Sequence, residues 1–269
     1  MADDPFNPDL SSVTQPGTTS VQPPPNLKQR LKESYNAIAP FYSDQTVLHR
    51  HLHMNITARL LRLLQAERGK NGVVPPSEDG APSPQMPGLD IHMQPVLRGK
   101  HALEVGCGSG VPVLELLLAE EMDTIGVDLS RGQLYLARAH FPNETATGQA
   151  VWAEQDMMEL RYPPDKFDLV VGLYSLIHLP REEQTVFLHR AFRWLKPGGM
   201  LMINFIKQEM EGQVIERWRG MPAAWMYWSS WGEEKTLQII NGLGLEVVVR
   251  EETGDVLDPD FVWVIAKKH

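Results

Sequence analysis

The stretch LEVGCGSGVPVLELLLAEE, residues 103–121, decides how the rest of the chain is interpreted. An apolar run enters a glycine-rich turn, leucines then recur at helical spacing, and GVDLS at 126–130 closes a second apolar run with an acid. This order predicts a strand, a turn, a helix and a second strand. Such a turn surrounds a ligand with backbone N–H groups and a helix N-terminus, and its glycines let the ligand approach closely. The stretch therefore predicts a ligand-binding α/β domain.

The same alternation of strand-like and helix-like segments continues from residue 100 to the C-terminus. Segments such as FDLVVGLYS and KPGGMLMINF are strand-like, and EEQTVFLHRAFRWL between them has helical spacing. The alternation predicts a doubly wound sheet with helices on both faces. In such sheets ligands bind beyond the carboxyl ends of the strands, where the glycine turn lies.

The N-terminal third of the chain has a different composition. We expect residues 1–25, rich in Pro, Ser and Thr, to be a disordered tail, and residues 26–68 to be helical, with Pro40 dividing them into two helices. Residues 69–98 are rich in Pro and Gly and predict a flexible insertion. The α/β domain then occupies residues 99–269.

Charge and composition exclude several classes of protein. The formal net charge is -9 and no dense Lys/Arg cluster occurs, so we expect no nucleic-acid partner. No apolar run reaches the 18 residues of a membrane span, and the acidic start does not resemble a signal peptide. A single cysteine, Cys107, excludes an internal disulfide. A cytoplasmic protein without a membrane anchor is expected.

The glycine spacing separates two kinds of cofactor. A dinucleotide fingerprint needs Gly-x-Gly-x-x-Gly. Here Gly106, Gly108 and Gly110 give Gly-x-Gly-x-Gly, and Val111 stands where the third glycine of the dinucleotide pattern would be. The spacing, together with LKPGGML, speaks against a nicotinamide-dependent oxidoreductase.

ALEVGCGSG resembles the first motif of class I S-adenosylmethionine-dependent methyltransferases. GVDLS, AEQDMMEL, FDLVVGLYSLIHL and LKPGGMLMI resemble the later segments of that family in order and spacing, over residues 99–205. The likeness is greatest to its small-molecule members, such as quinone-biosynthesis and natural-product enzymes. The resemblance implies a Rossmann-like seven-stranded sheet with an antiparallel last strand, and an N-terminal helical lid at 26–68.

The resemblance also implies the cofactor S-adenosylmethionine, with S-adenosylhomocysteine as product. Asp128 would hold the ribose hydroxyls, Asp156 the adenine amino group with Met157 on the purine face, and Glu104 the methionine amino group. Each acid has a structural alternative: the two aspartates as helix caps, and the glutamate as a support of the turn. The expected cofactor-binding residues are Tyr35, Tyr42, Glu104, Gly106, Cys107, Gly108, Gly110, Asp128, Leu129, Gln133, Asp156, Met157, Tyr174 and Ser175.

The sequence signals for residues that would contact the methyl acceptor are less specific than those for the cofactor. His178, beyond the strand FDLVVGL, is a candidate general base or a packing residue. Tyr35 and Tyr42 either close over the cofactor or brace a helix. Residues 206–232 fall where the family inserts elements over the acceptor, with Arg217 and Trp218 expected on a helix. The expected substrate-pocket residues are His178, Phe205, Trp225, Trp228 and Trp231, although such aromatic residues also build cores.

The predicted function is direct transfer of the sulfonium methyl group to an oxygen, nitrogen or sulfur of a small molecule, such as a secondary metabolite. A catalytically silent binding module and a protein methyltransferase are the alternatives. No metal is expected, because His49, His51 and His53 alternate along a helix and do not share one face. The acceptor, the use of a base and the oligomeric state stay open.

Overall fold

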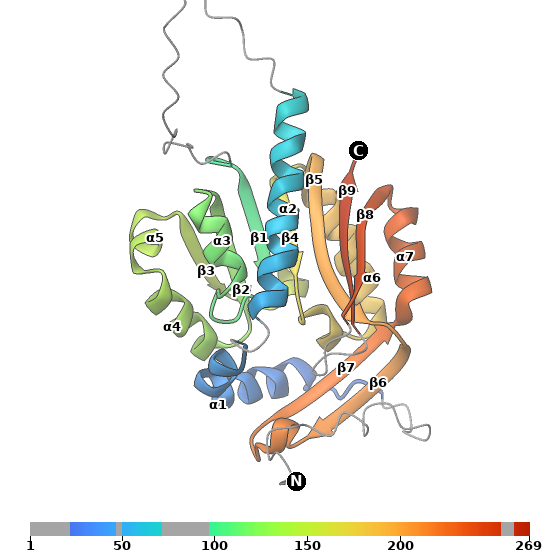
Figure 1. The fold of residues 1–269 in the computed structure, drawn as a ribbon. Helices are drawn as coiled ribbons and strands as arrows, with labels where there is room; N and C mark the ends of the chain where they lie inside the picture. The colour runs from blue at the N-terminus through green and yellow to red at the C-terminus, as the bar shows by residue number, and fades with distance from the viewer. Residues whose placement is uncertain (1–21, 47–49, 72–96, 254–260) are drawn as a thin grey trace, which may run out of the picture.

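The computed structural model describes residues 22–46, 50–71, 97–253 and 261–269. Most of the expected tail and of the expected insertion lies outside these residues. The described chain forms one seven-stranded sheet flanked by helices, and a separate two-stranded sheet. Figure 1 shows the small sheet below the carboxyl ends of the central strands, next to the N-terminal helix α1.

The large sheet has the strand order β3-β2-β1-β4-β5-β9-β8. The pairs among β1 to β5 are parallel, whereas β9 runs antiparallel to both β5 and β8. The expected seven-stranded, Rossmann-like sheet with an antiparallel last strand is thus confirmed. Its strands are β1 His101–Val105, β2 Asp123–Asp128, β3 Ala150–Glu154, β4 Phe167–Gly172, β5 Leu195–Ile206, β8 Leu245–Glu252 and β9 Phe261–Lys268.

Helices cover both faces of this sheet because both faces of its central strands are apolar. The buried leucines of α2, α3 and α4 pack on one face, and those of α6 with Ile240 of α7 pack on the other. The helices are α1 Leu27–Thr46, α2 Arg50–Asn71, α3 Val113–Ala119, α4 Arg131–His140, α5 Pro142–Thr147, α6 Arg181–Trp194 and α7 Gly232–Gly242. Strand order reverses between β1 and β4, so their carboxyl ends border a crevice.

The prediction that Pro40 divides the N-terminal helix is wrong. The helix α1 continues through Pro40 to Thr46. Proline removes one backbone N–H, but the adjacent Ile38 and Ala39 are 3% and 2% exposed, and Pro40 itself faces solvent. Burial of its neighbours therefore outweighs the lost hydrogen bond.

The two N-terminal helices have different positions, although the sequence predicts one lid. The helix α1 contacts α4 and the strand β7, and crosses the carboxyl ends of the central strands (Figure 1). By contrast, α2 packs against α3 and β5, on a face of the sheet. Only α1 therefore lies where a lid would cover the crevice.

The expected helix around Arg217 and Trp218 is also absent from the described fold. Residues 209–231 form a hairpin of β6 Glu209–Glu216 and β7 Trp225–Trp231, with a short 3-10 turn, η5 Trp218–Gly220, between them. Side chains alternate between faces in a strand. Trp225 and Trp231 consequently lie on one face of β7 and Trp228 on the other.

Candidate functional site

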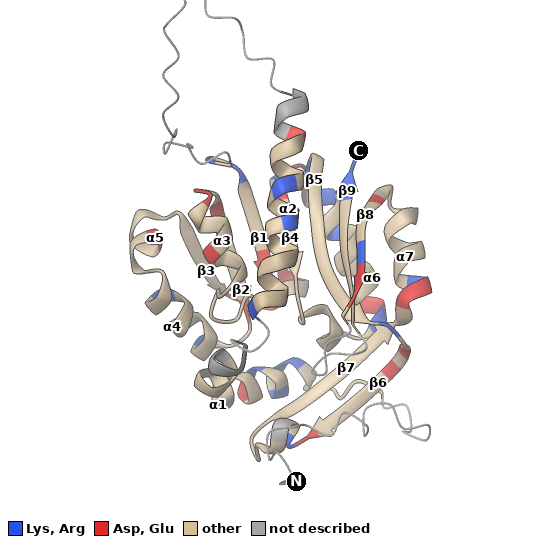
Figure 2. Cartoon of the chain, in the orientation of Figure 1, with Lys and Arg blue, Asp and Glu red and all other residues tan. Residues whose placement is uncertain are grey.

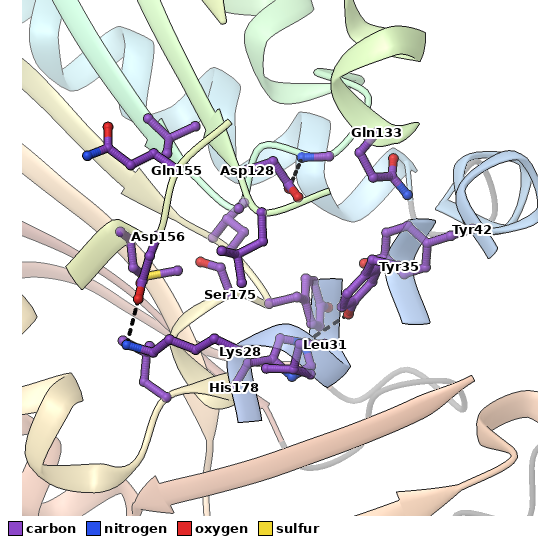
Figure 3. A pocket seen from close by; sticks show the side chains of 18 residues that line it. Lys28, Leu31, Tyr35, Tyr42, Asp128, Gln133, Gln155, Asp156, Ser175 and His178 are labelled. Carbon is purple, nitrogen blue, oxygen red and sulfur yellow. Dashed lines mark hydrogen bonds and ion pairs between the residues drawn. The ribbon is translucent and has the colours of Figure 1, made fainter. Parts of the chain in front are cut away.

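A cavity of about 720 Å³, including its open mouth, lies beneath α1 at the carboxyl ends of β1, β2 and β4. Figure 3 shows side chains from α1 on one side of it and Asp128, Gln133 and Ser175 on the other. The lining residues are Lys28, Leu31, Tyr35, Tyr42, Gly106, Gly108, Val127, Asp128, Leu129, Gln133, Gln155, Asp156, Met157, Leu173, Tyr174, Ser175, His178 and Leu179.

The glycine turn is fixed to the neighbouring strand by its backbone. The N–H groups of Gly106 and Cys107 both donate to the carbonyl of Val127, at 2.7 and 3.1 Å. A Cβ on Gly106 would lie 2.3 Å from the Cβ of Ser175, so no larger residue fits there. A Cβ on Gly108 would meet only Oε1 of Gln133, at 3.6 Å. Gly106 is therefore required by packing, whereas Gly108 leaves space on the cavity side.

Asp128 ends β2 at the centre of the cavity. Its Oδ2 accepts a hydrogen bond from the N–H of Gly108 at 2.9 Å (Figure 3), and its Oδ1 accepts one from the N–H of Ser130 at 2.7 Å. Burial raises the pKa of Asp128 to about 6, although these backbone hydrogen bonds oppose the shift. A ligand that donates hydrogen bonds to this carboxylate would favour its charged form.

Several buried polar atoms around the cavity have no partner in the protein. They are Oε2 of Glu104, both side-chain polar atoms of Gln133 and Oγ of Ser175. Glu104 lies behind the turn and is 5% exposed; burial, and then the charge of Asp128, raise its pKa well above the usual value. Unpartnered buried groups are rare because they are costly. A bound ligand that offers a cationic donor to Glu104, an acceptor to Nε2 of Gln133 and hydrogen-bonding groups to Oε1 of Gln133 and Oγ of Ser175 would satisfy these atoms.

Asp156 lies at the other end of the cavity and performs the capping role that the sequence left as an alternative. Its Oδ1 accepts a hydrogen bond from the N–H of Met158 at 2.9 Å, at the start of the 3-10 turn η3 Met157–Glu159. Its Oδ2 forms an ion pair with Nζ of Lys28, at 2.7 Å (Figure 3). A residue of α1 thus contacts the acid expected to bind adenine.

Tyr35 and His178 meet in the lining of the cavity. The two residues are separated by 143 positions in the chain, and the Tyr35 hydroxyl lies 2.8 Å from Nε2 of His178 (Figure 3). Nδ1 of His178 lies 2.9 Å from the carbonyl of Tyr227, which can only accept a hydrogen bond. Nδ1 therefore carries the proton, and Nε2 accepts from the tyrosine. Burial lowers the pKa of His178 to about 4, so the ring is neutral at pH 7.

Six lining residues are absent from the sequence prediction. They are Lys28, Leu31, Val127, Gln155, Leu173 and Leu179. Lys28 could have been predicted from the sequence. It precedes Tyr35 and Tyr42 at intervals of seven residues, so the three side chains share one face of a helix. Gln155 and Leu173 adjoin predicted residues in the chain.

Seven predicted residues do not line the cavity. Glu104, Cys107 and Gly110 support the turn from behind, and Cys107 is 6% exposed. Phe205 packs with the α6 side of the sheet, away from α2. The Trp231 indole N–H donates to the carbonyl of Arg181, which fixes that ring beside α6. Trp225 and Trp228 are 5% and 9% exposed within the core.

The described surface carries acidic and basic positions interspersed over many elements, as Figure 2 shows. In the part of the chain with described coordinates, no three His, Cys, Asp or Glu residues come together as a metal site. Of the helices that the structure describes, none combines the length and apolar character that crossing a membrane requires.

Comparison with known proteins gives a family for the central segment. Residues 102–199 match a family described as a methyltransferase domain. A 27-O-demethylrifamycin SV methyltransferase of Amycolatopsis mediterranei is 32% identical over 112 residues, which are 42% of this chain and 40% of that protein. The chain spans less than half the length of the first curated relatives that it matches.

Two solved structures share the fold along almost the whole chain. A Burkholderia thailandensis 1,6-didemethyltoxoflavin-N1-methyltransferase, with its acceptor and S-adenosylhomocysteine bound, has a TM-score of 0.61 at 14% identity, covering 94% of this chain and 93% of its own. A magnesium protoporphyrin IX methyltransferase from Synechocystis PCC 6803 with bound S-adenosylmethionine has a TM-score of 0.59 at 16% identity, covering 93% and 100%. These structures confirm the expected fold, and the family match confirms the recognition of a methyltransferase domain over residues 102–199.

Proposed function

We propose that this chain, which carries a methyltransferase domain over residues 102–199, transfers the methyl group of S-adenosylmethionine to an oxygen, nitrogen or sulfur of a small molecule. The observation that carries the proposal is the match between this cofactor and the polar groups in the cavity and directly behind its glycine turn. A carboxylate with a raised pKa, Asp128, lies midway along the cavity, and the unpartnered Glu104 lies behind the turn at one end.

The residues present fit the cofactor from end to end. Asp128 would accept the ribose hydroxyls, while Met157 and Asp156 would hold the adenine. Oε2 of Glu104 would accept from the methionine ammonium, and Gln133 and Ser175 offer further unpartnered polar atoms. When bound, the cofactor supplies an electrophilic methyl group on a positively charged sulfur.

The chain's own contribution to transfer would be to orient the acceptor, exclude water and remove a proton. The helix α1 covers the cavity, and Tyr35 places its hydroxyl on His178. A neutral imidazole with a pKa of about 4 is a weak base. Because Nε2 already accepts from Tyr35, the proton of an acceptor hydroxyl would pass to the Tyr35 oxygen as Tyr35 gives its own proton to Nε2. A weak base is sufficient, since the proton of that hydroxyl becomes strongly acidic as the new O–C bond forms. Amine or thiolate acceptors would not need it.

A small-molecule acceptor is consistent with the open-mouthed cavity and with the dispersed surface charge (Figure 2). The matched relatives include enzymes named for a rifamycin and for a toxoflavin precursor. These names support a secondary metabolite as the substrate class. A silent binding module is the alternative, and it would bind the cofactor without turnover.

The first test is calorimetric titration with S-adenosylhomocysteine and, separately, with NADH. Micromolar binding of the former alone supports the assignment, and methyl transfer from labelled S-adenosylmethionine to a metabolite panel then separates an enzyme from a silent module. A folded protein that ignores S-adenosylhomocysteine would refute the proposal.

Cofactor binding should weaken on acidification. The ribose needs the charged form of Asp128, whose pKa is raised from 3.8 to about 6, so affinity is lost as the pH falls through about 6. Between pH 7.5 and 5 we expect the Kd of S-adenosylhomocysteine to rise about tenfold. Glu104, whose pKa burial also raises, adds to the trend. Asp128→Asn should remove part of the slope, and the double variant with Glu104→Gln all of it. A Kd independent of pH would contradict the assignment.

The contact between α1 and α4 should control cofactor release. Oδ1 of Asn36 accepts hydrogen bonds from Oγ–H of Ser130 and from the N–H of Gly132, both at 2.9 Å. Losing two such bonds costs about 1–3 kcal/mol, so Asn36→Ala should speed S-adenosylhomocysteine dissociation roughly tenfold in stopped-flow measurements. Gln29→Ala, which removes an exposed bond within α1, is the control. Equal rates in both variants would mean that α1 does not retain the cofactor.

A further inference from the structure

Asn204 is a polar residue within a buried apolar strand. It lies in β5, where its neighbours Met202, Ile203, Phe205 and Ile206 are all buried, and it is itself 0% exposed. A core position of this kind normally takes an apolar side chain, because a buried amide has to find hydrogen-bond partners. Asn204 is not among the residues that line the cavity, so its contacts within the protein have to explain it.

The side-chain oxygen of Asn204 holds the backbone of Tyr174. Its Oδ1 accepts a hydrogen bond of 2.6 Å from the N–H of Tyr174. That N–H can only donate, so the contact determines which end of the amide faces it. Tyr174 has a φ of 50°, a left-handed conformation that is strained for tyrosine. Strain of this kind persists only where the surrounding structure holds it, and the bond from Asn204 is such a hold.

The bend at Tyr174 begins the segment that forms one wall of the cavity, where Ser175 and His178 also line it. Directly after the bend, Ser175 lies so close to the glycine turn that its Cβ would be 2.3 Å from a Cβ added to Gly106. The carbonyl of Ser175 then accepts from the N–H of His178 at 3.1 Å, in the short 3-10 turn η4 Leu176–His178. A change of chain direction at Tyr174 would therefore move both Ser175 and His178.

The ring of Tyr174 is fixed separately from its backbone. It stacks on the ring of His53 at a centroid distance of 5.3 Å, and it lies 4.9 Å from Phe261 and 5.6 Å from Trp263. Aromatic contacts at these distances anchor a ring in place. Loss of the bond from Asn204 should consequently move the chain that follows Tyr174 rather than the ring itself.

We propose that Asn204 is a positioning residue for methyl transfer. By holding the left-handed bend at Tyr174, it keeps Ser175 against the glycine turn. The same bend sets the distance of 2.8 Å between Nε2 of His178 and the hydroxyl of Tyr35. The inference rests on the proposed function and adds to it a residue outside the cavity lining. A purely structural residue would affect only the stability of the fold, whereas a positioning residue also affects the cavity wall in a protein that stays folded.

The first experiment observes the His178 ring of the ligand-free protein by 15N NMR, with its signals assigned by their loss in His178→Asn. Asn204→Leu keeps a similar shape but removes the acceptor, so the His178 signals should shift. Asn204→Val, a smaller apolar residue that suits a strand, is made alongside in case the leucine variant does not fold. Thr236→Val is the control, because it loses a buried hydrogen bond of 2.6 Å to the carbonyl of Gly232, within α7. Its unfolding midpoint should fall while the His178 signals stay in place.

The second experiment measures the Kd of S-adenosylhomocysteine by calorimetric titration. Asn204→Leu and Asn204→Val should raise it at least about tenfold, because Ser175 and the glycine turn belong to the proposed cofactor site. Asn204→Asp still offers an oxygen to the N–H of Tyr174, so it should recover most of the affinity and the wild-type His178 signals. Thr236→Val should bind within about twofold of the wild type.

Each outcome has a separate meaning. Unchanged His178 signals or an unchanged Kd in a folded apolar variant of Asn204 would overturn the proposal and leave Asn204 a structural residue. An equal shift of the signals in Thr236→Val would do the same, since the effect would then follow from any loss of stability. No recovery in Asn204→Asp would exclude Oδ1 as the cause. Failure of the wild-type protein to bind S-adenosylhomocysteine would instead refute the proposed function, while the NMR comparison, which needs no cofactor, would still test the hold on the segment.

Discussion

Gly108→Ala should keep the wild-type fold with a small loss of stability, and should bind S-adenosylhomocysteine about a hundredfold more weakly, a loss of ~2.7 kcal/mol in binding. Gly108 has a φ of +53°, and an added Cβ would meet only Oε1 of Gln133, at 3.6 Å. The protein therefore has room for the methyl group. The space that it would fill belongs to the cavity, where a ligand must approach the turn closely. Calorimetric titration, with circular dichroism to check folding, measures the effect.

The matched control is Gly148→Ala at the end of α5. Gly148 has a φ of +78°, and a Cβ added there would have no atom within 4 Å, so it shares the backbone strain of about 1–2 kcal/mol but not the cavity. Both variants should lose stability to a similar extent, and only Gly108→Ala should lose cofactor affinity. Wild-type affinity in Gly108→Ala would place the cofactor elsewhere.

His178→Asn should lower kcat at least about a hundredfold for a hydroxyl acceptor, which is the usual contribution of a positioned base. Asparagine keeps a polar side chain but cannot take up the acceptor's proton. The Kd of S-adenosylhomocysteine should stay within about twofold, because neither Asp128 nor the glycine turn hydrogen-bonds to His178. Turnover is measured with the acceptor identified in the methyl-transfer screen.

Tyr35→Phe tests how much of the catalytic effect of His178 depends on the hydroxyl of Tyr35. The ring remains packed on Tyr42, at a centroid distance of 5.3 Å, while the hydroxyl on Nε2 of His178 is lost. If the hydroxyl only orients the imidazole, kcat should fall less than in His178→Asn. Near-normal turnover in His178→Asn would remove this residue from catalysis altogether.

The sequence predicts the large sheet well because its signals are local. Short apolar runs, glycine turns and helical spacing define β1 to β5 without knowledge of distant contacts. The β6–β7 hairpin shows where this reasoning stops. A spacing of three residues, as in Trp225, Trp228 and Trp231, does not predict a strand. The segment forms a strand because β7 pairs with β6. Pro40 is a similar case, since burial of Ile38 and Ala39 maintains the helix around it.

The contacts of the candidate site also fall into two kinds: those within one local motif, which the sequence predicts, and those between distant segments, which it does not. Asp128 and Gly108 belong to one local motif, so their contact is predictable from a single stretch of sequence. The contacts of Lys28 with Asp156 and of Tyr35 with His178 join an N-terminal helix to the end of the sheet. No local pattern encodes such pairs. Helical spacing indicates which face of α1 is used, but only the folded chain shows what that face meets.

One helix, α1, contacts both ends of the cavity. Lys28 pairs with Asp156, Asn36 holds the start of α4, and Tyr35 meets His178. Under the proposed function, we expect product and fresh cofactor to pass beneath this helix, with one excursion of α1 in each catalytic cycle. The frequency of that excursion then sets a ceiling on turnover that is the same for every acceptor. Solvent viscosity should lower that ceiling even where the chemical step is fast.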